Sequence, residues 1–174
     1  MSTGKEKIIT SKSNGINVLY IDDEKSNLEV FKALVRRDGY NIYTTTSTKE
    51  AFKILKLNEI HIVLSDQRMV GITGIEFFES IIKDYPKPIR ILTTAYSDFH
   101  TVIDAINKGK VYKFLCKPWE NGCIRAALIQ SYEVYCLREH NEKLLTDLQK
   151  YNTELIGING KLEFMLHQKE SFNE

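Results

Sequence analysis

Acidic residues follow two apolar runs of this sequence, at places where carboxylates could bind a cation or accept a transferred group. Asp22 and Asp23 come directly after INVLYI (16–21), and Asp66 comes directly after IHIVLS (60–65). One such Asp alone is usually a turn residue, because its side chain bonds to nearby backbone. An isolated acidic pair usually complements the dipole of the helix that follows it. Whether these acids do chemistry together depends on the elements that position them.

Short runs rich in β-branched residues are predicted as strands, and the mostly apolar ones are expected to be buried on both faces. They are INVLYI (16–21), NIYTTT (41–46), IHIVLS (60–65), IRILTT (89–94) and VYKFLC (111–116). The segments between them carry apolar residues at helical spacing: Leu28, Phe31, Leu34 and Val35; Ala51, Ile54 and Leu55; Ile75, Phe78, Ile81 and Ile82; and Val102, Ala105 and Ile106. This alternation predicts an α/β fold, a five-stranded parallel sheet covered by helices on both faces.

In an open parallel sheet, ligands collect at the carboxyl ends of the strands, near the point where the strand order reverses. Asp22 and Asp23 follow the first predicted strand, Asp66 follows the third, Thr94 ends the fourth, and Lys117 follows the fifth. The second strand ends in TTTST, which carries no charge. We therefore expect three carboxylates, one hydroxyl and one ammonium group at a single edge of the sheet.

Such a set of side chains suits phosphoryl transfer to a carboxylate. Carboxylates within about 4 to 6 Å repel one another by several kcal/mol at an effective dielectric constant near 20, so a cation is expected among them. Oxygen ligands and retained waters suit Mg²⁺, with Asp22 and Asp23 as ligands. Asp66 would act as the nucleophile and form an aspartyl phosphate. Lys117 would neutralise phosphoryl oxygens, and the Thr94 hydroxyl would donate a hydrogen bond to one of them.

Four segments of the chain resemble the motifs of the response regulator receiver family, the CheY-like domains of two-component signalling. LYIDDEKSN, LSDQRM, LTTAY and FLCKPW are similar to its acidic pair, phosphoacceptor, switch hydroxyl and Lys-Pro motifs, in that order. The resemblance covers about residues 16–135. It implies a flavodoxin-like sheet with strand order 2-1-3-4-5 and a histidine kinase as the phosphodonor. The cytoplasmic location that we expect rests on the three cysteines, which indicate no disulfide framework.

The resemblance also assigns roles to individual residues. Asp66 would be the phosphorylation site, and Mg²⁺ would be held by Asp22, Asp23, Asp66 and the backbone carbonyl of Arg68. Thr94 and Lys117 would contact the phosphoryl group. Phe114 falls at the aromatic switch position, and Lys117–Pro118 is expected to be a cis peptide, a form that proline permits.

One residue departs from the family pattern. The family usually has Pro directly after the Met of the loop that follows the phosphoacceptor, and here that position is Val70. Proline would fix φ and remove an amide proton, whereas valine keeps a hydrogen-bond donor and a freer loop. The substitution touches no phosphoryl-binding group, so we expect it to affect the loop and the lifetime of the phosphorylated state.

The carboxyl-terminal segment has a heptad repeat without proline. Apolar residues alternate steps of four and three, with a positions at Asn141, Leu148, Leu155 and Leu162, and d positions at Leu137, Leu144, Tyr151, Ile158 and Met165. This predicts a coiled-coil homodimer, and an Asn at one a position is a register device in parallel dimers. The alternative is a helix that lies on its own domain or frays past Gly157, since Gly157 and Gly160 each cost about 1 kcal/mol in a helix.

Composition places the chain in a broad class. A formal net charge of +1 argues against a nucleic-acid surface spread over the whole chain. No run of 18 apolar residues occurs, so we expect no membrane span. Three cysteines without CxxC spacing predict neither a disulfide framework nor a metal knuckle. The predicted division is a disordered lead (1–15), a receiver domain (16–136) and a coiled-coil helix (137–174).

Several functional alternatives remain beside a free-standing switch. The chain could be the leading receiver of a larger signalling protein, for example a cyclic-dinucleotide phosphodiesterase, or a dimerisation module that is never phosphorylated. A phosphohydrolase of the haloacid-dehalogenase type would need an acid two residues after the nucleophile, where this chain has Arg68. No helix-turn-helix pattern with a basic face is visible. The resemblance suggests that a downstream partner docks on the face of the fourth helix, fifth strand and fifth helix, near Tyr112 and Trp119.

Overall fold

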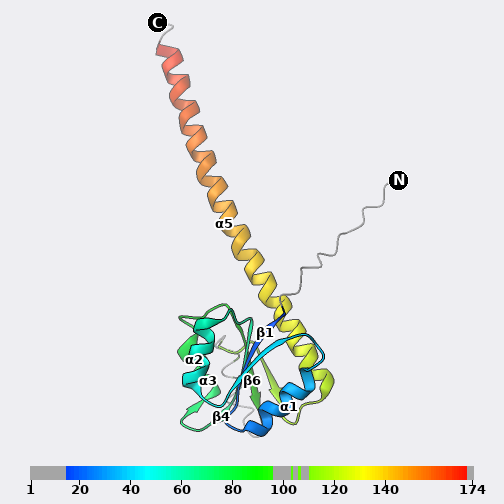
Figure 1. Ribbon diagram of the computed structural model, residues 1–174. Helices are drawn as coiled ribbons and strands as arrows, with labels where there is room; N and C mark the ends of the chain where they lie inside the picture. Colours follow the sequence, from blue (N-terminus) through cyan, green and yellow to red (C-terminus); the bar gives the residue numbers. More distant parts are fainter. Residues whose placement is uncertain (1–14, 96–102, 104–105, 107–109, 172–174) are drawn as a thin grey trace, which may run out of the picture. The chain divides into compact units, whose positions relative to one another are not determined.

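The structure is a computed structural model that describes residues 15–95, 103, 106 and 110–171 (Figure 1). The predicted disordered lead therefore lies outside the described residues, except for Gly15. Most of the helix predicted around Val102, Ala105 and Ile106 also lies outside them, although positions 103 and 106 are helical. Among the described residues, no helix is both long and apolar enough to cross a membrane.

A five-stranded parallel sheet forms the centre of the fold. Its strands are β1 (Asn17–Ile21), β2 (Asn41–Thr45), β3 (Ile62–Asp66), β6 (Ile89–Thr94) and β7 (Lys113–Cys116). They lie side by side in the order β2-β1-β3-β6-β7, and every neighbouring pair is parallel. The predicted α/β fold and the five-stranded parallel sheet are confirmed.

The predicted numbering of the strands needs a correction. The order written as 2-1-3-4-5 is 2-1-3-6-7 in the structure, because two strands were not predicted: β4 (Arg68–Met69) and β5 (Ile72–Thr73) form a separate antiparallel pair. Their turn contains Gly71, whose φ of +84° glycine adopts without strain. By residue, the five strands of the large sheet follow the predicted spatial order. Asp66 is the last residue of β3 rather than the residue after it.

Helices cover both faces of the sheet because successive strand residues point to opposite sides. The helices are α1 (Lys25–Val35), α2 (Thr48–Leu57), α3 (Gly74–Ile81) and α5 (Asn121–Ser171). Leu19, Val63 and Leu92 belong to the core that α2 and α3 cover. Their strand neighbours Val18, Ile62 and Ile91 belong to the core that α1 and the first part of α5 cover. Figure 1 shows this arrangement, with α2 and α3 on one side of the strands and α1 on the other.

The buried face of α3 differs from the predicted one. Phe77, Phe78 and Ile81 are fully buried, whereas Ile75 and Ile82 are only half-buried. The helix begins after Thr73, whose side chain forms a capping box with Glu76. That start places Gly74 and Phe77 on the inner face.

Gly74 lets α3 approach the end of β3 closely. A Cβ atom at this position would lie 2.3 Å from the backbone oxygen of Asp66 and 2.7 Å from Leu92 Cδ1. The contact with the Asp66 oxygen is the decisive one, because it is far shorter than Cβ atoms normally make and backbone cannot move away cheaply, so a side chain at this position would force α3 and β3 apart. The packing of α3 is thereby tied to the position of Asp66.

The chain divides into two compact units, the first ending at Tyr135 and the second beginning at Cys136. The second unit is helical as far as Ser171, and the helix continues through Gly157 and Gly160. The predicted long carboxyl-terminal helix is therefore confirmed, and the coiled coil remains a prediction. The large apolar side chains at the predicted a and d positions are all about half exposed or more, from 46% at Leu144 to 63% at Leu148.

Candidate functional site

Six predicted site residues line one cavity of about 300 Å³ at the carboxyl edge of the sheet. They are Asp22, Asp23, Asp66, Arg68, Thr94 and Lys117. The sheet order explains the gathering, because β1 and β6 flank β3, and β7 lies next to β6. Residues that are 95 positions apart in sequence thus come into direct contact.

Lys117 bridges two of the carboxylates. Its Nζ donates to Asp22 Oδ2 at 2.6 Å and also to Asp66 Oδ1. The side chains of Asp22 and Asp66 are 0% and 10% exposed, and that of Lys117 is 22% exposed. Burial by itself would lower the pKa of the Lys117 ammonium, but the two carboxylates outweigh it and raise that pKa. Lys117 therefore stays charged and is the counter-ion of this pair.

Asp22 is surrounded by hydrogen-bond donors. Oδ2 accepts from the Tyr20 hydroxyl as well as from Lys117, and Oδ1 accepts from the Glu24 backbone N–H and from Asn27 Nδ2, both at 3.0 Å. Burial, the largest single effect, raises the pKa of Asp22, yet these hydrogen bonds together hold it below its usual value. Asp22 is thus a fixed anion whose two oxygens are both engaged.

Asp66 is held less tightly. Oδ2 accepts from the Arg68 backbone N–H at 2.7 Å, and the Thr93 hydroxyl lies 3.4 Å from Oδ1. Burial raises the pKa of Asp66 above its usual value, although Lys117 and the Arg68 N–H act in the opposite direction. A carboxylate with a raised pKa is more basic, which favours its attack on an electrophile.

Asp23 makes one hydrogen bond in the site. Its Oδ2 accepts from the backbone N–H of Val70 at 3.1 Å, which joins the loop after β1 to the β4–β5 hairpin. The expectation that valine would leave the loop an additional hydrogen-bond donor is borne out. The Val70 side chain itself is 89% exposed and packs against nothing in the core.

The two predicted switch residues are placed differently. Thr94 lines the cavity, and its hydroxyl donates to the Ala95 carbonyl at 3.1 Å. Phe114 lies outside the cavity lining and is half-buried against the core beneath α2 and α3. The Lys117–Pro118 peptide is cis, as predicted.

Among the residues that were not predicted from the sequence, Tyr20, Asn27 and Thr93 contact Asp22 or Asp66 with their side chains. Tyr20 precedes Asp22 by two positions, so strand periodicity places both side chains on the same face and could have indicated the contact. Thr93 pairs with Asp66 in the register of β3 and β6, which required the strand order to be known. Asn27 lies one turn into α1, and no sequence signal pointed to it.

The response regulator receiver domain family matches this chain over residues 18–129. The chain belongs to this family.

Relatives of this receiver domain are regulators of greater length. It is 27% identical over 132 residues to the hydrogenase transcriptional regulatory protein HoxA of Cupriavidus necator, covering 76% of this chain and 27% of HoxA. It is 30% identical over 154 residues to the transcriptional regulatory protein ZraR of Escherichia coli O157:H7, covering 88% of this chain and 33% of ZraR. The chain thus spans about a quarter to a third of the curated relatives it matches.

A solved structure also resembles the receiver domain. An uncharacterized protein from Neptuniibacter caesariensis has 38% sequence identity and a TM-score of 0.69, with 72% of this chain and 93% of that chain covered. Proteins of this family generally depend on Mg²⁺, so the fit of this cavity to that ion can be tested on its oxygen atoms.

The donor set of the cavity fits Mg²⁺. Asp22, Asp23 and Asp66 supply only oxygen, the ligand atom that Mg²⁺ prefers, and no sulfur or imidazole group lines the cavity. Among the described residues, no three acidic, His or Cys side chains converge closely enough to ligate one ion directly. The fit is therefore to a cation held by one or two carboxylates and retained waters, which is the usual mode for Mg²⁺.

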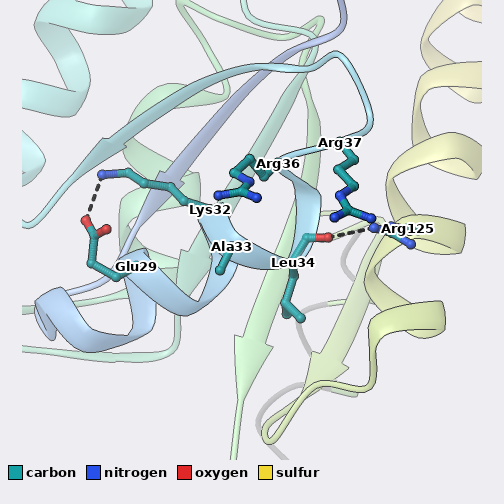
Figure 2. Close-up of a pocket in the computed structure, with 7 residues that line it drawn as sticks. All are labelled: Glu29, Lys32, Ala33, Leu34, Arg36, Arg37 and Arg125. Atoms are coloured by element: carbon teal, nitrogen blue, oxygen red, sulfur yellow. Dashed lines mark hydrogen bonds and ion pairs between the residues drawn. The ribbon is translucent and has the colours of Figure 1, made fainter.

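A separate cavity of about 640 Å³ lies at the carboxyl end of α1 and is lined by basic side chains (Figure 2). They are Lys32, Arg36, Arg37 and Arg125. Lys32 is paired with Glu29, and Arg125 donates to Asp38 and to the Leu34 carbonyl. Cations at a helix C-terminus are stabilised by the helix dipole, so the basic cluster is explained without a bound anion.

Proposed function

We propose that this receiver domain accepts a phosphoryl group from a histidine kinase at Asp66, with Mg²⁺ as its cofactor. The observation that carries the proposal is the double contact of Lys117 with Asp22 and Asp66 in the cavity that Asp23 also lines. Buried carboxylates with one ammonium group supply a nucleophile and charge neutralisation, and phosphoryl transfer requires little else.

Asp66 performs the bond-making step. One of its carboxylate oxygens attacks the phosphorus of a phosphohistidine, so that an O–P bond forms while the N–P bond breaks and the imidazole nitrogen takes the electron pair. When bound, Mg²⁺ would supply neutralising charge to the phosphoryl oxygens. The Arg68 backbone N–H holds Asp66 Oδ2 and leaves Oδ1 on the side of Lys117.

Lys117 and Thr94 respond to the new group. Lys117 moves its donated hydrogen bond from Asp66 to a phosphoryl oxygen while its bond to Asp22 keeps it in place. The Thr94 hydroxyl exchanges the Ala95 carbonyl for a phosphoryl oxygen, and Phe114 turns inward as Thr94 moves. In this proposal the receiver domain assists its own phosphorylation and dephosphorylation, without a separate catalytic unit among the described residues.

The second unit is proposed to form a coiled-coil homodimer. Its large a and d side chains are exposed in a single chain, which a second copy of the same seam would cover. In this register Gly157 lies at a c position and Gly160 at an f position, and a Cβ at either would meet nothing within 4 Å. The glycines thus lower helix propensity without interrupting the seam. Phosphorylation is proposed to change the geometry of this dimer.

The length of the relatives favours a second interpretation of the chain, in which the chemistry of the site is unchanged. HoxA and ZraR are named transcriptional regulators and are about three to four times longer than the matched region. The receiver and helix described above would then be the input module of a larger signalling protein, with the same chemistry at Asp66. A downstream partner would dock on the predicted face near Tyr112, which is 40% exposed; the fourth helix of that face lies mainly outside the described residues.

Phosphorylation is tested by exposing the purified chain to acetyl phosphate and Mg²⁺ and measuring its intact mass. We expect the mass of one phosphoryl group to be added to the wild type and none to Asp66→Asn. Asp84→Asn is the matched control, because Asp84 is an exposed acid outside the cavity, and it should gain the same mass as the wild type. A wild type without the gain, or an Asp66→Asn variant with it, would refute the proposal.

A further inference from the structure

The hydrogen bond between Val70 and Asp23 joins two segments that are far apart in sequence. The Val70 backbone N–H donates to Asp23 Oδ2 at 3.1 Å across a separation of 47 residues. One partner belongs to the loop after β1, and the other to the turn of the β4–β5 hairpin. It is the contact through which the hairpin reaches the acidic pair.

The backbone N–H at position 70 is available as a donor because this residue is not proline. Met69 pairs with Ile72 in the hairpin, so Val70 and Gly71 are the two central residues of its turn. A φ of +84° at Gly71 matches the second central residue of a type II turn. Proline is common at the first central position of that turn, and it is the residue usual in receivers. The turn would accept proline, but proline has no N–H to donate.

With the Val70 N–H bound to Asp23 Oδ2, the other oxygen of this carboxylate, Oδ1, is left without a donor from the described residues. Both oxygens of Asp22 accept two hydrogen bonds each, and both oxygens of Asp66 accept at least one. Asp23 Oδ2 accepts from Val70, whereas Asp23 Oδ1 has no hydrogen-bond partner among the described residues. Among these carboxylate oxygens, Asp23 Oδ1 is therefore the one that a cation can approach without competing with a hydrogen-bond donor from the described residues.

We propose that Val70 is a positioning residue for the divalent cation: its N–H fixes the Asp23 carboxylate with Oδ1 turned to the cation. The inference rests on the proposed function, since it assumes that the cavity binds Mg²⁺. Groups that hydrogen-bond a metal ligand orient it and strengthen metal binding, and losing one weakens binding by tenfold or more at buried sites. At this exposed turn we expect a smaller effect, about 3- to 10-fold.

The test compares Val70→Pro with Val70→Ala in the full chain. Val70→Pro removes the N–H and suits the turn, whereas Val70→Ala removes the side chain and keeps the N–H. Mg²⁺ affinity is measured by calorimetry and by the fluorescence of Trp119, the chain's single tryptophan, whose ring centre lies 5.8 Å from Lys117 Nζ. We expect Mg²⁺ to bind Val70→Pro about 3- to 10-fold more weakly and Val70→Ala as tightly as the wild type.

Hydrogen exchange and urea unfolding separate positioning from a purely structural role. The inference expects Mg²⁺ to slow exchange of the Val70 amide and the urea midpoint of Val70→Pro to stay near that of the wild type. Equal Mg²⁺ affinity in Val70→Pro and wild type would overturn the inference alone. So would an equal loss in Val70→Ala, because the N–H would then not be the cause. A wild type that binds no Mg²⁺ would overturn the proposed function as well.

Discussion

Replacing Lys117 by Met tests the charge balance of the site. Methionine keeps the unbranched side chain as far as Cε and removes the ammonium group, so Asp22 and Asp66 lose a shared donor. A hydrogen bond to a charged group contributes about 1.5–3 kcal/mol, and two are lost. Since the Lys117 side chain is 22% exposed, water replaces part of each bond. We expect the free energy of unfolding to fall by about 2–4 kcal/mol at pH 7 without divalent cations.

The dependence on pH has a definite sign. Burial already raises the pKa of Asp66, and removing Lys117 raises it further. A carboxyl group whose pKa is higher in the folded state takes up a proton on folding, so its contribution to stability is lost as pH rises through the folded-state pKa. The deficit of Lys117→Met should therefore shrink as pH is lowered from 7 towards about 5. In the wild type the pKa of Asp22 is lowered by folding, so the contribution of Asp22 to the free energy of unfolding is lost as pH falls.

The assay is urea unfolding at fixed protein concentration, followed by Trp119 fluorescence. Lys110→Met is the matched control, because Lys110 pairs with Glu79 at the surface, where the two side chains are 32% and 44% exposed. An exposed pair contributes about 0–1 kcal/mol. The reasoning is refuted if Lys117→Met loses no more stability than Lys110→Met, or if its deficit grows on acidification.

Three further outcomes are expected. Tyr20→Phe removes a buried donor to Asp22 and should lower the free energy of unfolding by about 1–2 kcal/mol; acid unfolding should also begin at a higher pH, since the Asp22 pKa rises. Gly74→Ala puts a Cβ against the Asp66 carbonyl and should cost about 1–3 kcal/mol in urea unfolding, with slower phosphorylation by acetyl phosphate. Truncation after Arg138 should give a monomer by light scattering, and a truncated chain that stayed dimeric would exclude the coiled coil as the dimer contact.

Three charged residues of the cavity were predictable because their positions depend on strand ends. Asp22, Asp66 and Lys117 follow or end apolar runs, and a parallel sheet brings such positions to one edge whatever the details of packing. The hydrogen-bond partners of these side chains were not predictable. Lys117 was expected to neutralise phosphoryl oxygens, and in the structure it binds Asp22 and Asp66. Which groups Lys117 contacts depends on distances of a few ångströms, and these cannot be read from the order of the residues.

The parts of the fold that were missed are short or lack periodicity. β4 and β5 have two residues each, too few for an alternating pattern to appear. The buried face of α3 was predicted at the wrong residues, because the start of the helix depends on the Thr73–Glu76 capping box and on the tight fit of Gly74. The heptad pattern of the tail predicted a long helix correctly, since it needs only local spacing.

The charges of the site explain why cation and phosphoryl group should act together. The acidic residues that line the cavity are Asp22, Asp23, Glu24 and Asp66, and the basic ones are Arg68 and Lys117, so four negative charges against two positive charges leave an excess of two negative charges. An incoming phosphoryl group is itself anionic, so it would be repelled by several kcal/mol at an effective dielectric constant near 20. One divalent cation offsets that excess. Among these carboxylates, Asp23 Oδ1 accepts no hydrogen bond from the described residues, so cation binding there leaves Lys117 on Asp22 and Asp66, ready to shift to the phosphoryl group.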